Sequence, residues 1–190
     1  MDVVQAKALR REGERVRLRP VQDGDLEDLV DAADDEAIAR WTDLPHPYSR
    51  EHGARFIALA EEEARVGKSF HLAIATIEAD RLVGMAALSD VDLESHNAEI
   101  GIWLGREMWG EGVAFEAFDL LLEIAFDRLD LTKLYGVVLE GNKASIDLFK
   151  RYGFHEEGRL RWHTRRQGDW MDKIFFGLLR EEWERRTGRA

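Results

Sequence analysis

The stretch 106-REMWGEGVAFEAFDLLLEIAF-126 constrains the fold more than any other part of the sequence. From Val113 to Phe126 it has no proline and is apolar around most of a helical circumference, which predicts a helix buried between two layers. Gly110 and Gly112 stand at the start of this helix, and the strand-like 98-AEIGIWL-104 precedes them. A strand, a glycine turn and a helix amino terminus can present backbone N–H groups to an anion, usually phosphate. The same glycines could instead only shape a turn.

The rest of the chain alternates between strand and helix patterns without an internal repeat. Strand-like runs lie at 16–21, 70–77, 82–91, 133–139 and 170–179, and helix-like runs lie at 26–41, 49–66 and 143–152. The short polar segment between 70–77 and 82–91 predicts an antiparallel hairpin. This order predicts an α+β fold with a mixed sheet.

Composition favours one globular domain. The chain has 190 residues, of which 45% are hydrophobic and 34% are charged, and no segment rich in Pro, Gly or Ser divides it. It contains no cysteine, which excludes disulfides, thiolate metal ligands and transfer through a cysteine thioester. The histidines and acidic residues show no metal-ligand spacing, so no metal is expected. The amino-terminal sequence lacks a signal peptide pattern and no run is long enough to span a membrane, so a cytoplasmic protein is expected.

Charge is distributed unevenly. The formal net charge of −11 argues against a nucleic-acid-binding role, because phosphate contacts need a basic surface. Between Gln22 and Ala64 there are 13 acidic residues and 3 arginines. That surface should attract cations, although charged residues on solvated helix faces are common.

The glycine turn is not a dinucleotide fingerprint. The third glycine of that pattern is missing because position 115 is Phe, and no Lys-Ser pair of a P-loop follows. A pyrophosphate held mainly by backbone N–H groups remains compatible with the turn.

The segment 109-WGEGVA-114 resembles the acetyl-CoA signature Gln/Arg-x-x-Gly-x-Gly/Ala of the GCN5-related N-acetyltransferases, the GNAT superfamily. Trp109 stands where Gln or Arg is usual, as in the branch of ribosomal-protein alanine N-acetyltransferases and small-amine acetyltransferases. Further matches occur in the expected order, at 16-VRLRPV-21, 98-AEIGIWL-104, Asn142 to Ser145, 151-RYGF-154 and Trp170-x-Asp172. The resemblance spans residues 16–183. It therefore implies one N-acetyltransferase domain over 1–190, with 1–15 as an extension.

The resemblance implies a GNAT fold: a mixed, mostly antiparallel sheet with helices on both faces and a splay between its two central strands. It also implies that acetyl-CoA donates an acetyl group to an amine, with its pyrophosphate on the glycine turn. The cofactor-binding residues carried over in this way are Ile102, Trp103, Leu104, Trp109, Gly110, Glu111, Gly112, Val113, Ala114, Asn142 and Ser145. The acceptor-binding residues expected from the family's pocket position are Trp41, His46, Tyr48, Trp162 and His163.

Acetyl transfer to an amine needs a group that removes a proton from the ammonium. Glu99 is the expected base: alternation along the strand puts it on one face with Gly101, which leaves room for a ligand, and it matches the base of histone-modifying relatives. An exposed carboxylate at a strand end is the alternative. Ser145 matches the residue that donates a proton to the thiolate in the ribosomal branch, but could instead bond backbone as a helix-start serine.

Two departures from the family leave a second function open. Phe149 replaces the tyrosine that many relatives carry, and 161-RWHTRR-166 lacks the late glutamate of the ribosomal enzymes. An acetyl-CoA-binding sensor or interaction module without turnover is therefore the alternative to an enzyme. The acceptor itself stays open among protein N-termini, polyamines, amino sugars and antibiotics. Tryptophans in the late strands make a homodimer a further expectation.

Overall fold

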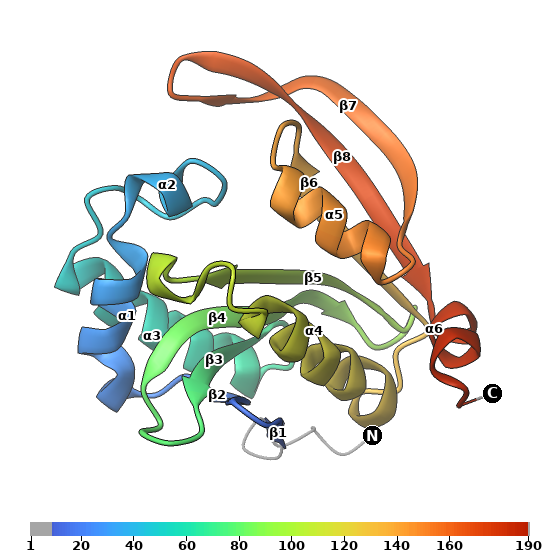
Figure 1. Cartoon of the computed structure of the whole chain (residues 1–190), viewed down its shortest axis with the longest axis horizontal. Coiled ribbons are helices and arrows are strands. Elements are labelled where there is room, and N and C mark those ends of the chain that lie inside the picture. Colours follow the sequence, from blue (N-terminus) through green and yellow to red (C-terminus); the bar gives the residue numbers. More distant parts are fainter. Residues whose placement is uncertain (1–8, 190) are drawn as a thin grey trace.

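The structure, a computed structural model, describes residues 9–189 and is built on one eight-stranded sheet (Figure 1). The strand order is β1-β2-β3-β4-β5-β6-β8-β7. The strands are β1 (Arg11–Glu12), β2 (Val16–Pro20), β3 (Phe70–Thr76), β4 (Leu82–Asp92), β5 (Asn97–Leu104), β6 (Lys133–Leu139), β7 (His155–Arg166) and β8 (Asp169–Leu179). Neighbouring strands are antiparallel except β5 and β6, which run parallel. The predicted mixed, mostly antiparallel sheet is confirmed.

Helices cover both faces of this sheet. They are α1 (Leu26–Ala33), α2 (Glu36–Ala39), α3 (Arg50–Arg65), α4 (Val113–Glu123), α5 (Lys143–Arg151) and α6 (Arg180–Thr187), with short helical turns η2 (Asp23–Asp25), η3 (Arg106–Met108) and η4 (Ile124–Arg128). Leu29 of α1 and Ile57 of α3 pack on one face, in a cluster with Ala73 and Met85. The predicted buried helix α4 packs on the other face with α5. None of the helices in the described range is long and apolar enough to cross a membrane.

The predicted helix over 26–41 is interrupted in the structure. Asp34 ends α1, and its carboxylate accepts a hydrogen bond from the Tyr48 backbone N–H at 2.7 Å. The Asp35 side chain then caps α2 by accepting from the Ala37 N–H at 2.7 Å. Short polar side chains of this kind compete with the helix for backbone groups, so the amphipathic pattern continues across a break.

The two central strands separate after three residue pairs. β5 and β6 are paired at Asn97 with Lys133, Ala98 with Leu134 and Glu99 with Tyr135. Farther along, these two strands are not paired with each other. The facing edges beyond this point carry backbone donors and acceptors that no neighbouring strand satisfies. The predicted splay is thus confirmed, and Glu99 lies at its closed end.

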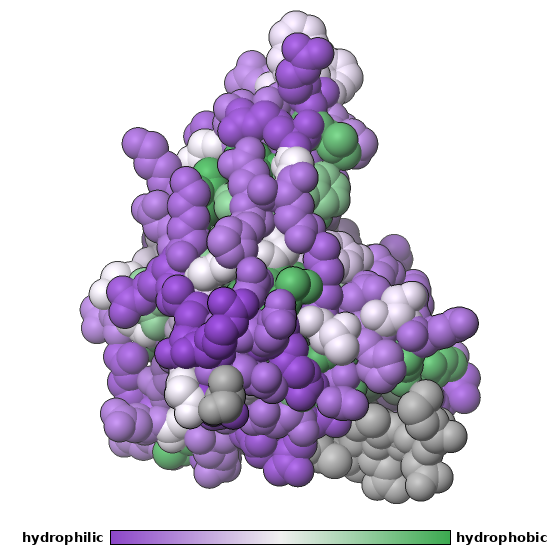
Figure 2. All heavy atoms as spheres, turned by 90° about the vertical axis from the view of Figure 1, so that its right-hand side faces the viewer, coloured by the Kyte–Doolittle hydropathy of each residue, from purple (hydrophilic) through white to green (hydrophobic). Residues whose placement is uncertain are grey.

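The β7–β8 hairpin extends beyond the rest of the sheet and arches toward α2 (Figure 1). At its tip Arg166 forms an ion pair with Asp43, and the Gln167 amide donates to Glu36 at 3.2 Å. Figure 2 views the molecule from the right-hand side of Figure 1 and shows a face that is largely hydrophilic. No residue range was predicted for β7, because its side chains are almost all exposed and carry no alternating apolar pattern.

Candidate active site

A groove of about 770 Å³ is lined by the end of β5, the glycine turn, the first turn of α4, α5 and the segment around α2. Most of the predicted cofactor-binding residues line it, namely Ile102, Trp103, Leu104, Trp109, Gly110, Gly112, Ala114, Asn142 and Ser145. Glu111 and Val113 do not: Val113 is buried in the core, and the Glu111 carbonyl accepts a hydrogen bond from Arg15. The turn and the end of β5 therefore meet α5 around one elongated space.

The glycine turn presents its backbone to this groove. Gly110 and Gly112 adopt positive φ angles of 80° and 76°, which glycine tolerates best. In the described chain, the N–H groups of 110–114 take no part in the backbone hydrogen bonds of turns and caps. They lie at the amino terminus of α4, whose dipole favours an anion. Free donors, two left-handed glycines and a helix terminus fit a pyrophosphate.

An arginine and a glutamate fix this turn from outside the groove. The Glu116 carboxylate accepts from the Arg15 and Val16 backbone N–H groups at 2.8 and 3.2 Å and pairs with the Arg15 guanidinium at 3.0 Å. The same guanidinium donates to the Glu111 carbonyl at 2.5 Å. Sequence reasoning missed this clamp because its partners lie 101 residues apart. It joins the start of the sheet to the first turn of α4.

The opposite wall begins at the amino terminus of α5. Asn142 caps this helix, since its side-chain oxygen accepts from the Ser145 N–H at 3.2 Å. Ser145 also lines the groove, so this residue both takes part in the start of α5 and faces the groove. Trp41 lines the groove as well and lies against Gly141, where an added Cβ would be 3.6 Å from the indole ring.

Glu99 lies at the closed end of the splay and is partly buried. Burial raises its pKa above the ordinary glutamate range; the nearby carboxylates of Asp90 and Asp43 raise it further, and Lys173 opposes them. Tyr135 is its cross-strand partner, and burial followed by the charges of Glu99 and Asp90 raises the pKa of that phenol. Tyr135 and Asp90 are neighbours of Glu99 that the sequence did not reveal, because they lie on the adjacent strands β6 and β4.

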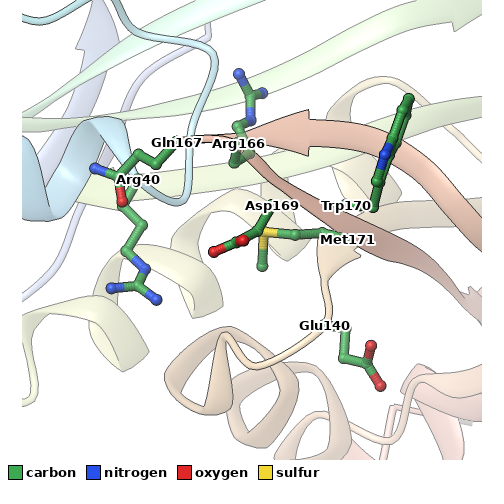
Figure 3. A pocket seen from close by; sticks show the side chains of 7 residues that line it. All are labelled: Arg40, Glu140, Arg166, Gln167, Asp169, Trp170 and Met171. Carbon is green, nitrogen blue, oxygen red and sulfur yellow. The ribbon is translucent and has the colours of Figure 1, made fainter.

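A smaller cavity of about 210 Å³ lies under the tip of the hairpin (Figure 3). Its walls combine two arginines with two carboxylates and an indole; the lining residues are Arg40, Glu140, Arg166, Gln167, Asp169, Trp170 and Met171. Arg166 connects this cavity to the Glu99 surroundings, since its ion-pair partner Asp43 is one of the charges that act on Glu99.

The expected acceptor residues are dispersed. Trp41 alone reaches the larger groove, and none of the others lines either cavity. His46 lies 3.2 Å from Asp34, and Tyr48 is buried against the α1–α3 cluster. Trp162 is 71% exposed, and His163 beside it is exposed on β7. Their part in acceptor binding stays a prediction, as does the homodimer expected from the late tryptophans.

No group of three or more His, Asp or Glu side chains within residues 9–189 is arranged to hold a metal ion.

Comparison with known proteins places these features in a family. Residues 15–155 match the acetyltransferase (GNAT) domain. N-acetyltransferase p20 of Bacillus licheniformis is 30% identical over 171 residues, which cover 90% of this chain and 96% of the relative.

Two solved structures share the fold. The ribosomal-protein-S5-alanine acetyltransferase of Vibrio fischeri superposes with a TM-score of 0.80 at 17% identity, covering 92% of this chain and 98% of that one. The spermidine N-acetyltransferase of Vibrio cholerae, solved with CoA and spermine, gives a TM-score of 0.78 at 22% identity, with 88% and 97% covered. With its domain match, its full-length relative and its splayed sheet, the chain belongs to the GNAT family of acetyltransferases.

Proposed function

We propose that this chain transfers the acetyl group of acetyl-CoA directly to a primary amine while both substrates are bound. The observation that carries the proposal is the position of Glu99, a partly buried carboxylate at the closed end of the splay, on the strand whose residues 102–104 line the groove. The absence of cysteine from the sequence favours direct transfer over a cysteine acyl-enzyme.

The residues of the groove fit acetyl-CoA from end to end. The N–H groups of 110–114 would bind the pyrophosphate, with the α4 dipole adding to the attraction, whereas the Trp109 N–H already donates to the Arg106 carbonyl. The unpaired edge of β5 at 102–104 offers backbone groups to the amides of the pantetheine arm. Asn142 and Ser145 line the same space from α5.

Glu99 would act as the general base. An alkyl ammonium gives its proton to the carboxylate, and the neutral amine then attacks the thioester carbonyl. A C–N bond forms to give a tetrahedral intermediate; as its C–S bond breaks, the nitrogen loses its extra proton and the departing thiolate gains one. Because Phe149 is buried and has no hydroxyl, Ser145 in the groove and Tyr135 beside Glu99 are the hydroxyls placed to supply that proton.

The acceptor would be cationic. Asp90 is the charged group that acts most on Glu99, and it is negative; Lys173 opposes it, and Asp43 adds less and is paired with Arg166. The fold is shared with a protein solved with spermine, a polyamine, which is consistent with such an acceptor. Much of the acidic stretch at 22–64 is locally neutralised, as in the pairs Asp35–Arg106 and Glu62–Arg65, so the charges nearest Glu99 matter most.

A panel assay tests the proposal. Purified protein is incubated with acetyl-CoA and spermidine, an alanine-terminated peptide, an amino sugar or an acidic amine, and thiol release and acetylated product are both measured. Product formation with intersecting initial-velocity patterns is expected. Ping-pong patterns with a trapped acetyl-enzyme would contradict direct transfer. Tight acetyl-CoA binding without any product would support a binding module, the function favoured by the missing hydroxyl at Phe149.

A further inference from the structure

The smaller cavity, under the tip of the β7–β8 hairpin, contains two charged side chains that lack a charged partner. Four charged residues line it, and two of them, Glu140 and Arg166, are already paired with residues outside the cavity. The other two, Arg40 and Asp169, form no ion pair of 4.0 Å or less within residues 9–189. One positive and one negative charge are therefore available to a ligand in this cavity.

Arg40 and Asp169 belong to different elements on either side of the cavity. Arg40 ends α2, and its guanidinium carbon lies 5.1 Å from the centre of the Trp41 ring. Asp169 is the first residue of β8, and Figure 3 shows its carboxylate turned toward the side on which Arg40 lies. A group held between them must accept a hydrogen bond from the guanidinium and donate one to the carboxylate.

A peptide group meets both requirements, because its C=O accepts and its N–H donates. A protonated polyamine has donors only, and in this cavity it would be repelled by Arg40. A carboxylate has acceptors only, and it would be repelled by Asp169. The pair of unpartnered charges thus favours a neutral group that carries a donor and an acceptor side by side.

The cavity lies on the face of the sheet to which Glu99 belongs. Met171, which lines the cavity, alternates along β8 with Lys173, whose charge acts on Glu99. Glu99 is paired with Tyr135, and Glu140 of the cavity stands five positions farther along the chain, just after β6. At about 3.3 Å per residue this corresponds to roughly 16 Å, the length of about five residues of extended peptide. A single sugar ring, whose hydroxyls also donate and accept, is shorter than this.

We propose that Arg40 and Asp169 bind a peptide group of the acceptor several residues from its amine, so that the chain acts on the amino terminus of a polypeptide. The inference rests on the proposed function, because it takes Glu99 as the base that meets the amine. The terminal ammonium of a polypeptide still meets the Glu99 carboxylate and the nearby charge of Asp90. Small amines would reach Glu99 without the second contact.

Steady-state kinetics with alanine amide and with alanine-terminated peptide amides of increasing length, up to about eight residues, test the assignment. In the wild-type protein kcat/KM should rise about three- to tenfold once the peptide reaches the cavity, mainly through a lower KM. Arg40→Gln and Asp169→Ala should each remove this rise, so that long peptides react no better than alanine amide. Arg55→Gln and Glu61→Ala, which remove the same charges from exposed positions of α3, should keep the rise.

An ester scan of the longest peptide locates the bound group. Replacing one peptide bond by an ester removes its N–H, so the ester at the bound position should raise KM in the wild-type protein. The same ester should have no further effect in Asp169→Ala, because the acceptor of that N–H is already missing. A scan without any such position would overturn the assignment.

The length series separates this inference from the proposed function. Product from every peptide with no rise in kcat/KM would overturn the peptide site and leave acetyl transfer standing. A rise that survives both Arg40→Gln and Asp169→Ala would overturn it as well. Absence of product with every amine would overturn the proposed function and this inference with it. The melting temperature of each variant confirms that the fold is retained.

Discussion

Glu99 and Tyr135 are the last paired residues of β5 and β6 before the two strands separate. The carboxylate therefore lies where the sheet closes, with the open edges of both strands on one side. Burial acts on the pKa of both side chains in the same direction, upward, which keeps the phenol neutral at pH 7 and brings the glutamate closer to the working pH of a base. The pair marks the point at which a donor in the groove would meet its acceptor.

Glu99→Gln should lower turnover by about 10²- to 10⁴-fold, the usual contribution of a general base. Affinity for CoA should change little, because Glu99 does not line the groove. In the wild-type protein the acidic limb of the kcat/KM profile should report the raised pKa of Glu99. In the variant that limb should disappear and activity should move toward alkaline pH, where the amine is already neutral. Unchanged turnover with an unchanged profile would remove Glu99 from the mechanism.

Glu99→Gln, which should lower turnover, should raise the stability of the folded protein near neutral pH. Because the folded protein raises the pKa of Glu99, the unfolded chain ionises first as pH rises, and stability is lost as pH climbs from the ordinary glutamate range through the raised pKa. Glu99→Gln removes this loss, so its melting temperature should exceed that of the wild-type protein near neutral pH. The difference should shrink below the ordinary glutamate range, where both states are protonated. A lower melting temperature for the variant at neutral pH would contradict burial as the dominant cause.

Gly112→Val should remove measurable CoA binding. The variant should still fold, with a lower melting temperature than the wild-type protein. The valine must adopt a φ of 76°, which costs about 1–3 kcal/mol, and its Cβ would lie 3.5 Å from the Arg15 guanidinium that holds the Glu111 carbonyl, so the turn would be distorted. Gly67→Val is the matched control, since Gly67 has a φ of 72° and lies at the end of α3, away from the groove. Calorimetry should show normal CoA affinity for the control despite a similar drop in melting temperature. Equal affinities in the two variants would contradict the anion-binding turn.

Glu116→Gln should weaken both the fold and the turn. Burial works against the charge, but the N–H groups of Arg15 and Val16 and the Arg15 guanidinium together lower the pKa of Glu116. A lowered folded pKa contributes stability above the ordinary glutamate range and loses it as pH falls through the folded value. We therefore expect a loss of about 1–2 kcal/mol at pH 7 that shrinks in acid.

The turn provides the second readout for this variant. Because Arg15 also holds the Glu111 carbonyl, Glu116→Gln should raise the Kd of CoA several-fold. Glu123→Gln is the control on the same helix: it loses surface ion pairs with Arg11 and Arg189 and should leave CoA binding unchanged. A normal Kd for Glu116→Gln would show that the turn holds its shape without the clamp.

Much of this architecture could be predicted where the sequence carries a local signal. The apolar run after Gly112 predicted α4, and the resemblance placed the turn, the splay and most of the groove residues. The contacts of Arg15 with Glu116 and the positions of Asp90 and Tyr135 near Glu99 could not be predicted, because each depends on residues of other elements. β7 had no predicted range for a different reason: it is held by pairing with β8 while its side chains remain in solvent.

The charge of the acceptor can be tested at Asp90. This exposed residue of β4 raises the pKa of Glu99 from a neighbouring strand, and its φ of 47° is one that asparagine also tolerates. Asp90→Asn should therefore raise KM for cationic amines while leaving KM for neutral amines unchanged, and it should move the acidic limb of the profile to lower pH. Added salt should reduce the wild-type preference for cations, because screening acts within about 10 Å at 0.1 M.

Glu61→Gln serves as the control for that test, since it removes the same charge from an exposed position on α3. Steady-state kinetics with a diamine and a neutral amine of equal length should separate the two variants, with Glu61→Gln close to the wild-type protein. Equal effects of both substitutions would assign the preference to net charge, because Asp90 acts on Glu99 and Glu61 does not. Equal activity on acidic and basic amines at low salt, in the wild-type protein, would remove electrostatic selection of the acceptor altogether.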